Sequence, residues 1–145
     1  MKLSKIFSDE EKKRIVDAIA KIESTSSAEV RVHIESKCPA SPVDNAVRAF
    51  SKLKMHKTRD KNGVLLYIAV NSKKCAIVGD EGINKNVDKN FWDLCCEKML
   101  LSFKNNNYCQ GIVDALGMAG VELTKHFPIR EDDTNELSNE ISFGK

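Results

Sequence analysis

The sequence predicts an α/β domain, a three-layer α/β/α sandwich in which a central mixed sheet has helices on both faces. Helix-like and strand-like patterns follow each other in the order helix, strand, helix, strand, strand, helix, helix, and this order suits such a sheet. The segment 63–70, GVLLYIAV, is an unbroken apolar run, which is typical of a central strand covered on both faces. The segment 28–35 instead alternates apolar and polar residues, which is typical of a strand with one exposed face.

The bulk composition indicates one ordinary globular domain. A chain of 145 residues with 41% hydrophobic and 30% charged residues has the composition neither of a disordered chain nor of a membrane protein. The formal net charge of +2 provides no general attraction for nucleic acid or anionic lipid. Because the N-terminus lacks the apolar run of a signal peptide, we expect a cytoplasmic monomer with neither a nucleic-acid nor a membrane partner.

We divide the chain into a folded domain, residues 1–127, and an acidic C-terminal tail, residues 128–145. The composition changes after Pro128, where few core-forming residues remain. This segment contains two basic residues, Arg130 and Lys145, and a larger number of acidic residues. The acidic residues are Glu131, Asp132, Asp133, Glu136 and Glu140.

The first two helices have clear start signals. Ser8, followed three positions later by Glu11, forms a capping box for a helix that runs from about residue 9 to residue 24. Ser41 and Pro42 provide an N-cap and a first-turn proline for the second helix. Its predicted buried stripe is Val43, Ala46, Val47, Phe50 and Leu53.

The second half of the chain is predicted to contain a hairpin and two long helices. Residues 54–62 form a polar, basic loop before the apolar strand, and the turn 71–73 returns the chain as an antiparallel strand over 74–79. The third helix begins near Asp88 and the fourth ends before Phe127. Gly117 and Gly120 weaken the fourth helix by about 1 kcal/mol each, which indicates close packing against a neighbour.

This order of elements gathers acidic residues at one edge of the sheet. If the first two strands are parallel through a right-handed crossover, the hairpin returns Asp80 to the edge that holds Ser26 and the loop 54–62. Hard cations such as Ca²⁺ and Mg²⁺ take several oxygen ligands. We therefore predict a cation site at this edge. Its candidate ligands are Asp80, Glu81, Asp88, Asp132 and Asp133.

Each of these acids also has a simpler interpretation. Asp80 and Glu81 are good turn residues, Asp88 is a good N-cap, and acids in a tail are usually solvated. The basic residues of the loop 54–62 could hold a phosphate, although a solvated loop is the better interpretation. The five cysteines lack metal or redox spacing, so we interpret them as reduced thiols, and we assign no catalytic residue.

Several segments together resemble the TPM domain family, in particular its short, free-standing bacterial members. These segments are TSSAEVRV (25–32), KT (57–58) through NGVLL (62–66), AIVGDEGI (76–83), FW (91–92), GI (111–112), NEL (135–137) and ISFGK (141–145). The resemblance implies a three-layer α/β/α fold and divalent-cation binding, and a plant member of the family is known as a weak acid phosphatase. The acidic loop of the family falls on Asp80 and Glu81.

Three functions follow as hypotheses. The first is a binding module for Ca²⁺ or Mg²⁺ that can present its acidic edge to a protein partner. The alternative is a metal-assisted acid phosphatase acting on phosphomonoesters, in which Lys57 or Arg59 steadies the phosphate. The third is an interaction domain without an ion, in which the acidic tail makes the contact.

Overall fold

The computed structural model describes residues 3–131 and 135–144. Its sheet contains four strands in the order β3-β2-β1-β4. The strands are β1 (Glu29–Glu35), β2 (Gly63–Ala69), β3 (Lys74–Gly79) and β4 (Ser142–Phe143). β1 is parallel to both β2 and β4, whereas β2 and β3 form the predicted antiparallel hairpin.

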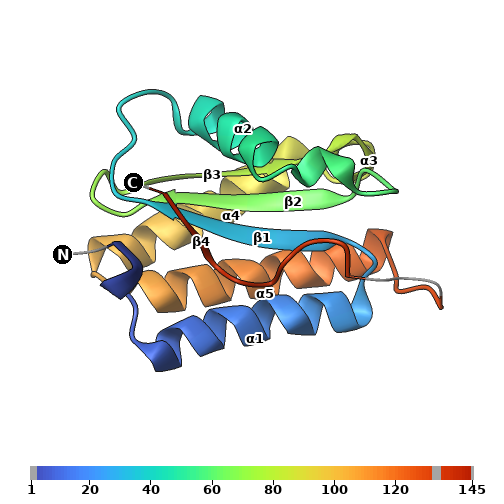
Figure 1. Cartoon of the computed structure of the whole chain (residues 1–145), viewed down its shortest axis with the longest axis horizontal. Coiled ribbons are helices and arrows are strands. Elements are labelled where there is room, and N and C mark those ends of the chain that lie inside the picture. The colour runs from blue at the N-terminus through green and yellow to red at the C-terminus, as the bar shows by residue number, and fades with distance from the viewer. Residues whose placement is uncertain (1–2, 132–134, 145) are drawn as a thin grey trace.

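Helices cover both faces of the sheet, so the predicted three-layer sandwich is confirmed (Figure 1). The long helices α1 (Asp9–Thr25), α4 (Lys89–Lys104) and α5 (Tyr108–His126) pack on one face, and α2 (Pro42–Lys52) packs on the other. Three short elements complete the fold: η1 (Leu3–Lys5), η2 (Met55–Lys57) and α3 (Glu81–Asn84).

Local sequence signals explain where the helices begin. Ser8 and Glu11 form the predicted capping box: the Ser8 hydroxyl accepts the Glu11 N–H at 3.1 Å, and Glu11 Oε1 accepts the Ser8 N–H at 3.0 Å. These bonds satisfy N–H groups that have no partner inside a helix. Pro42 occupies the first turn of α2, where its missing N–H costs nothing.

The core has two parts, one on each side of the sheet. The larger part lies between the sheet and the three long helices, and the smaller lies between the sheet and α2. Every residue of β2 is buried, which confirms the central strand predicted from its apolar run. The predicted stripe of α2 is partly wrong, because Val43 and Val47 are 48% and 52% exposed. The helix instead buries Ala46 and Ala49, whose small side chains allow close approach to the sheet.

The polar face of β1 is covered by the tail, a feature that the sequence analysis did not predict. α2 packs over β2 and β3, so it leaves this part of the sheet open. Residues 135–144 run along the gap: Arg31 donates to the Glu140 carbonyl at 3.2 Å, and the Gly144 N–H donates to the Ile34 carbonyl at 2.8 Å. Glu29 and His33 are consequently only 3% and 8% exposed.

Candidate functional site

The hairpin delivers Asp80 to the edge of the sheet where β1 and β2 begin. The Asp80 N–H donates to the Gly63 carbonyl at 2.9 Å, and the Gly82 N–H donates to the Lys61 carbonyl at 2.8 Å. α3, β1 and β2 start at this edge, on the right in Figure 1, and α1 and α5 end there. The convergence predicted for this edge is therefore present in the backbone.

Asp80 uses only one of its two carboxylate oxygens within the protein. Oδ1 accepts the Glu81 N–H at 2.8 Å and so caps α3. Oδ2 is buried and has no hydrogen-bond partner. The Glu81 side chain is exposed. Asp80 thus has the predicted turn role, and one of its oxygens has no hydrogen-bond partner.

The structure describes only one of the remaining predicted ligands, Asp88. Asp88 is exposed and caps α4 by accepting the Asn90 N–H at 3.0 Å, as its simpler interpretation predicted. Asp132 and Asp133 lie outside the described residues. Within residues 3–131 and 135–144, no three His, Cys, Asp or Glu side chains are grouped so that they could share a metal ion.

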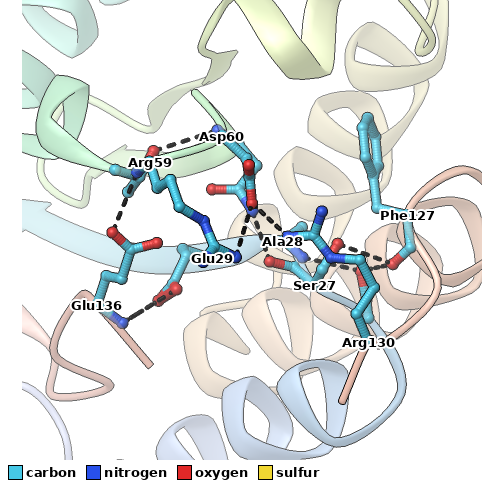
Figure 2. A network of polar contacts seen from close by, with 11 residues as sticks. Ser27, Ala28, Glu29, Arg59, Asp60, Phe127, Arg130 and Glu136 are labelled. Carbon is cyan, nitrogen blue, oxygen red and sulfur yellow. Dashed lines mark hydrogen bonds and ion pairs between the residues drawn. The ribbon is translucent and has the colours of Figure 1, made fainter. Parts of the chain in front are cut away.

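The structure brings together a different set of charged residues at the same edge (Figure 2). Asp60, in the basic loop, accepts a hydrogen bond from the guanidinium of Arg130 and forms an ion pair with Arg59 at 3.5 Å. The hydrogen bond from Arg130 and the charges of both guanidiniums lower the pKa of Asp60. The Arg59 N–H in turn donates to Glu136 Oε2 at 3.1 Å. The ion pair between Arg130 and Asp60 and the backbone hydrogen bond to Glu136 therefore join the loop to the tail.

Glu29, the first residue of β1, anchors the tail to this edge. Its carboxylate accepts the Glu136 N–H with both oxygens at 3.0 Å and the Leu137 N–H at 3.1 Å. Glu29 and Glu23, which lies in the last turns of α1, both line a small cavity of about 70 Å³. Burial, and after it the negative charge of Glu29, raises the pKa of Glu23 to about 7. Two carboxyl groups, one buried and one half-buried, therefore lie close together at this edge, and both their burial and their mutual repulsion disfavour ionisation.

Asn62 contributes a second unsatisfied oxygen. Its side chain is 3% exposed, and its Nδ2 donates to the Ser27 carbonyl at 2.6 Å. Its Oδ1 is buried without a hydrogen-bond partner. Sequence reasoning did not single out Glu23, Glu29 or Asn62, although Asn62 directly precedes the apolar strand that positions it.

The other candidate groups from the sequence have ordinary environments. The basic loop is exposed, as predicted, at Lys57, Arg59 and Lys61. All five cysteines are free thiols. His126 pairs with Glu122 across one helical turn at 2.8 Å. Of the helices in the described part of the chain, none has the length and apolar character needed to cross a membrane.

Comparisons with known proteins agree on one family. Residues 1–121 match the sequence model of the TPM domain. The solution structure of the BA42 protein from the psychrophilic bacterium Bizionia argentinensis is 44% identical over 99% of both chains and superposes with a TM-score of 0.89. No curated protein matches the chain significantly.

Two more distant structures share the fold. The N-terminal domain of a protein from P. gingivalis is 16% identical, over 86% of this chain and 80% of that one, with a TM-score of 0.70. The N-terminal domain of the cg2496 protein from Corynebacterium glutamicum is 12% identical, over 81% and 74% of the two chains, with a TM-score of 0.64. From the family match and the similarity to BA42, the chain belongs to the TPM domain family.

Proposed function

We propose that this protein binds a divalent cation, Ca²⁺ or Mg²⁺, at the edge where β1 and β2 begin. The observation that carries the proposal is the pair of buried oxygens, Asn62 Oδ1 and Asp80 Oδ2, that have no hydrogen-bond donor. Buried polar atoms nearly always have a partner, so an unpaired one calls for an explanation. Carboxylate and amide oxygens are the ligands that these hard cations prefer.

The charge of the edge supports the same proposal. Glu23 and Glu29 lie close enough for the charge of one to raise the pKa of the other, and a cation at this edge would offset their repulsion. Asp80 is the principal ligand in our proposal. The exposed Glu81 and Asp88 and the tail acids Asp132 and Asp133 would supply further oxygens, directly or through water. The loaded edge would then offer a rigid surface to a protein partner.

A titration of the apo protein with CaCl₂ or MgCl₂, followed by amide chemical shifts, tests this proposal. We expect shifts over residues 79–88, at Asn62 and in the tail segment 130–137, which saturate at millimolar ion or below. Asp80→Asn should weaken binding at least about tenfold, because it removes the charged ligand. Asp17→Asn, an exposed carboxylate on α1, is the matched control and should leave binding unchanged. If millimolar ion moves no resonance at the edge, the proposal is wrong.

A metal-assisted phosphatase is the second candidate. It is favoured by one observation: Arg59, with a side chain 54% exposed, lies in the loop that contacts α3 through the Gly82 N–H. In this alternative, the cation polarises a phosphoryl oxygen and Arg59 or Lys57 holds the phosphate. Hydrolysis of a phosphomonoester, measured with and without chelator, distinguishes it from binding alone. Activity that persists in Asp80→Asn or in chelator contradicts this mechanism.

A further inference from the structure

A second group of chemically active side chains lies at the opposite end of β1. An open cavity of about 580 Å³ is formed there by the end of β1, β4 and one side of α2. It lies between α2 and the tail strand β4, beside the end of β1. Its volume is within the range of small-molecule pockets, about 300–1,000 Å³. Its lining residues include His33, Glu35, Arg48, Lys52 and Ser142.

Three of these residues form a continuous hydrogen-bonded chain. Ser142 Oγ lies 2.9 Å from His33 Nδ1, and His33 Nε2 lies 3.0 Å from Glu35 Oε1. The pairing of β4 with β1 places Ser142 directly opposite His33. A hydroxyl, an imidazole and a carboxylate in this order are the elements of an activated serine nucleophile.

The surroundings fix the direction of these hydrogen bonds. The Tyr67 hydroxyl donates to Glu35 Oε2 at 2.9 Å and accepts from Asn45 Nδ2 at 3.3 Å. Burial raises the pKa of Tyr67, so its hydroxyl remains a donor at neutral pH. The carboxylate of Glu35 therefore accepts from both Tyr67 and His33 Nε2–H. In the neutral imidazole with its proton on Nε2, Nδ1 is the acceptor that faces the Ser142 hydroxyl.

The rings of His33 and Tyr67 also stack, with their centroids 6.0 Å apart and their planes inclined by 25°. Tyr67 is fully buried, so it holds the imidazole against a rigid surface. A base whose position is fixed by packing and by a second hydrogen bond needs little reorganisation during reaction.

The rim of the cavity favours an anionic ligand. Arg48 and Lys52 lie one turn apart on α2, and both are exposed and line the cavity. Ala49, Leu53 and Phe143 provide the apolar part of the lining. A small molecule with a negative group at one end and a carbonyl group at the other matches this distribution.

We propose that this cavity is a hydrolytic site for small carboxylic esters that carry an anionic group, with Ser142 as nucleophile, His33 as general base and Glu35 as the residue that orients His33. Ser142 Oγ attacks the carbonyl carbon and its proton moves to His33 Nδ1. The ester C–O bond then breaks, and the alkoxide leaves with that proton as an alcohol. A water molecule attacks the acyl-serine by the same route and releases the carboxylic acid and free Ser142.

This proposal is independent of the cation site, because the two lie at opposite ends of β1. Chelator should not change the ester hydrolysis, and Asp80→Asn should not change it either. Conversely, loss of the proposed cation binding would leave this cavity as described.

The direct test is covalent labelling of the full-length protein with a fluorophosphonate, followed by peptide mass spectrometry. We expect modification at Ser142, blocked in Ser142→Ala and unchanged in Ser51→Ala, an exposed serine on α2 that serves as the matched control. Ser142→Cys, which keeps the size of the side chain, should react with a thiol-directed probe. Absence of label on Ser142, or equal label on Ser51, would overturn the proposal.

Steady-state hydrolysis of two 4-nitrophenyl esters, acetate and hemisuccinate, tests the roles of the other residues. Ser142→Ala should reduce kcat/KM at least roughly 10³-fold. Glu35→Gln should reduce kcat and change the pH profile, because the charge that stabilises the imidazolium is lost. Arg48→Ala should raise KM for the hemisuccinate several-fold more than for the acetate. If Ser142→Ala retains the activity, the reaction does not use this site and the assignment is wrong.

Discussion

Both carboxylate oxygens of Glu29 accept the backbone N–H of Glu136, each at 3.0 Å, although the two residues are 107 positions apart in the chain. This contact joins the first residue of β1 to the tail and explains how a carboxylate with 3% exposure is tolerated. It also holds Glu136 and Leu137 of the tail at the start of β1. The tail is therefore a structural part of the candidate cation edge.

Removing the charge of Glu29 should release the tail. Glu29→Gln places an amide group where main-chain donors need an acceptor, and hydrogen bonds to a charged group contribute about 1.5–3 kcal/mol. We expect the amide hydrogens of Glu136 and Leu137 to exchange at least about tenfold faster. Glu131→Gln, an exposed tail residue, is the control. Unchanged exchange in Glu29→Gln would show that the tail is held by other contacts.

The raised pKa of Glu23 predicts that stability decreases with rising pH. The folded protein holds a proton on Glu23 up to about pH 7, whereas the unfolded chain loses it near the ordinary glutamate pKa of 4.5. Between these values the folded state binds more protons, so the free energy of unfolding falls as pH rises. The loss should total about 2 kcal/mol after allowance for partial solvent screening.

Urea denaturation of the wild type and of Glu23→Gln at pH 5 and pH 7.5 measures this effect. The variant has no ionisable group at position 23, so its stability should change less across that range. Glu97→Gln, on the exposed side of α4, should behave like the wild type. Parallel pH dependences in all three proteins would contradict the assignment to Glu23.

Two glycines should respond in opposite ways to substitution by alanine. A Cβ on Gly82 would lie 2.6 Å from the carbonyl oxygens of Asp60 and Lys61, so Gly82→Ala must push α3 away from the basic loop and should cost about 1–3 kcal/mol. Gly117 lies inside α5 with no neighbour within 4 Å of such a Cβ, so Gly117→Ala should stabilise by about 0.4–1 kcal/mol. Midpoints of urea denaturation measure both.

The cysteine thiols should react slowly in the folded protein. Burial raises the pKa of Cys95 to about 12, a hydrogen bond with Cys75 and burial raise the pKa of Cys96, and burial raises the pKa of Cys109. Because the thiolate is the reactive form, iodoacetamide at pH 7.5 should alkylate these three thiols at least about a hundredfold more slowly in buffer than in denaturant. Mass spectrometry of each peptide gives the rates. Rapid modification of Cys95 in buffer would mean that α4 opens readily.

Local patterns explain what the sequence could predict. The Ser8 cap, the buried run of β2 and the hairpin turn each depend on neighbours a few residues away, and so does the return of Asp80 to the edge. β4 could not be predicted in this way, because Ser142 and Phe143 are too few to show a strand period. The burial of Glu29 and His33 was not predicted either, because the groups that cover them come from the distant tail.

For the predicted metal ligands, the sequence likewise predicts position better than hydrogen bonding. The position of Asp80 beside the start of β2 was predicted from the sequence and is confirmed. The choice between a capping aspartate and a ligand depends on individual oxygens. Asp80 Oδ1 caps a helix while Oδ2 stays unpaired, and no sequence pattern distinguishes these two states. Asn62 was overlooked because an asparagine before a strand is an ordinary turn residue.

The pairing of β1 with a strand from the distant tail also affects how the chain folds. A contact between residues 109 positions apart costs much loop entropy and tends to form late. Until it forms, β1 is an open sheet edge, and such edges recruit other chains into aggregates. The charged side chains Glu29, Arg31 and Glu35 oppose such association during that interval. The polar residues of β1 that bind the tail in the native state thus also reduce aggregation while the sheet is incomplete.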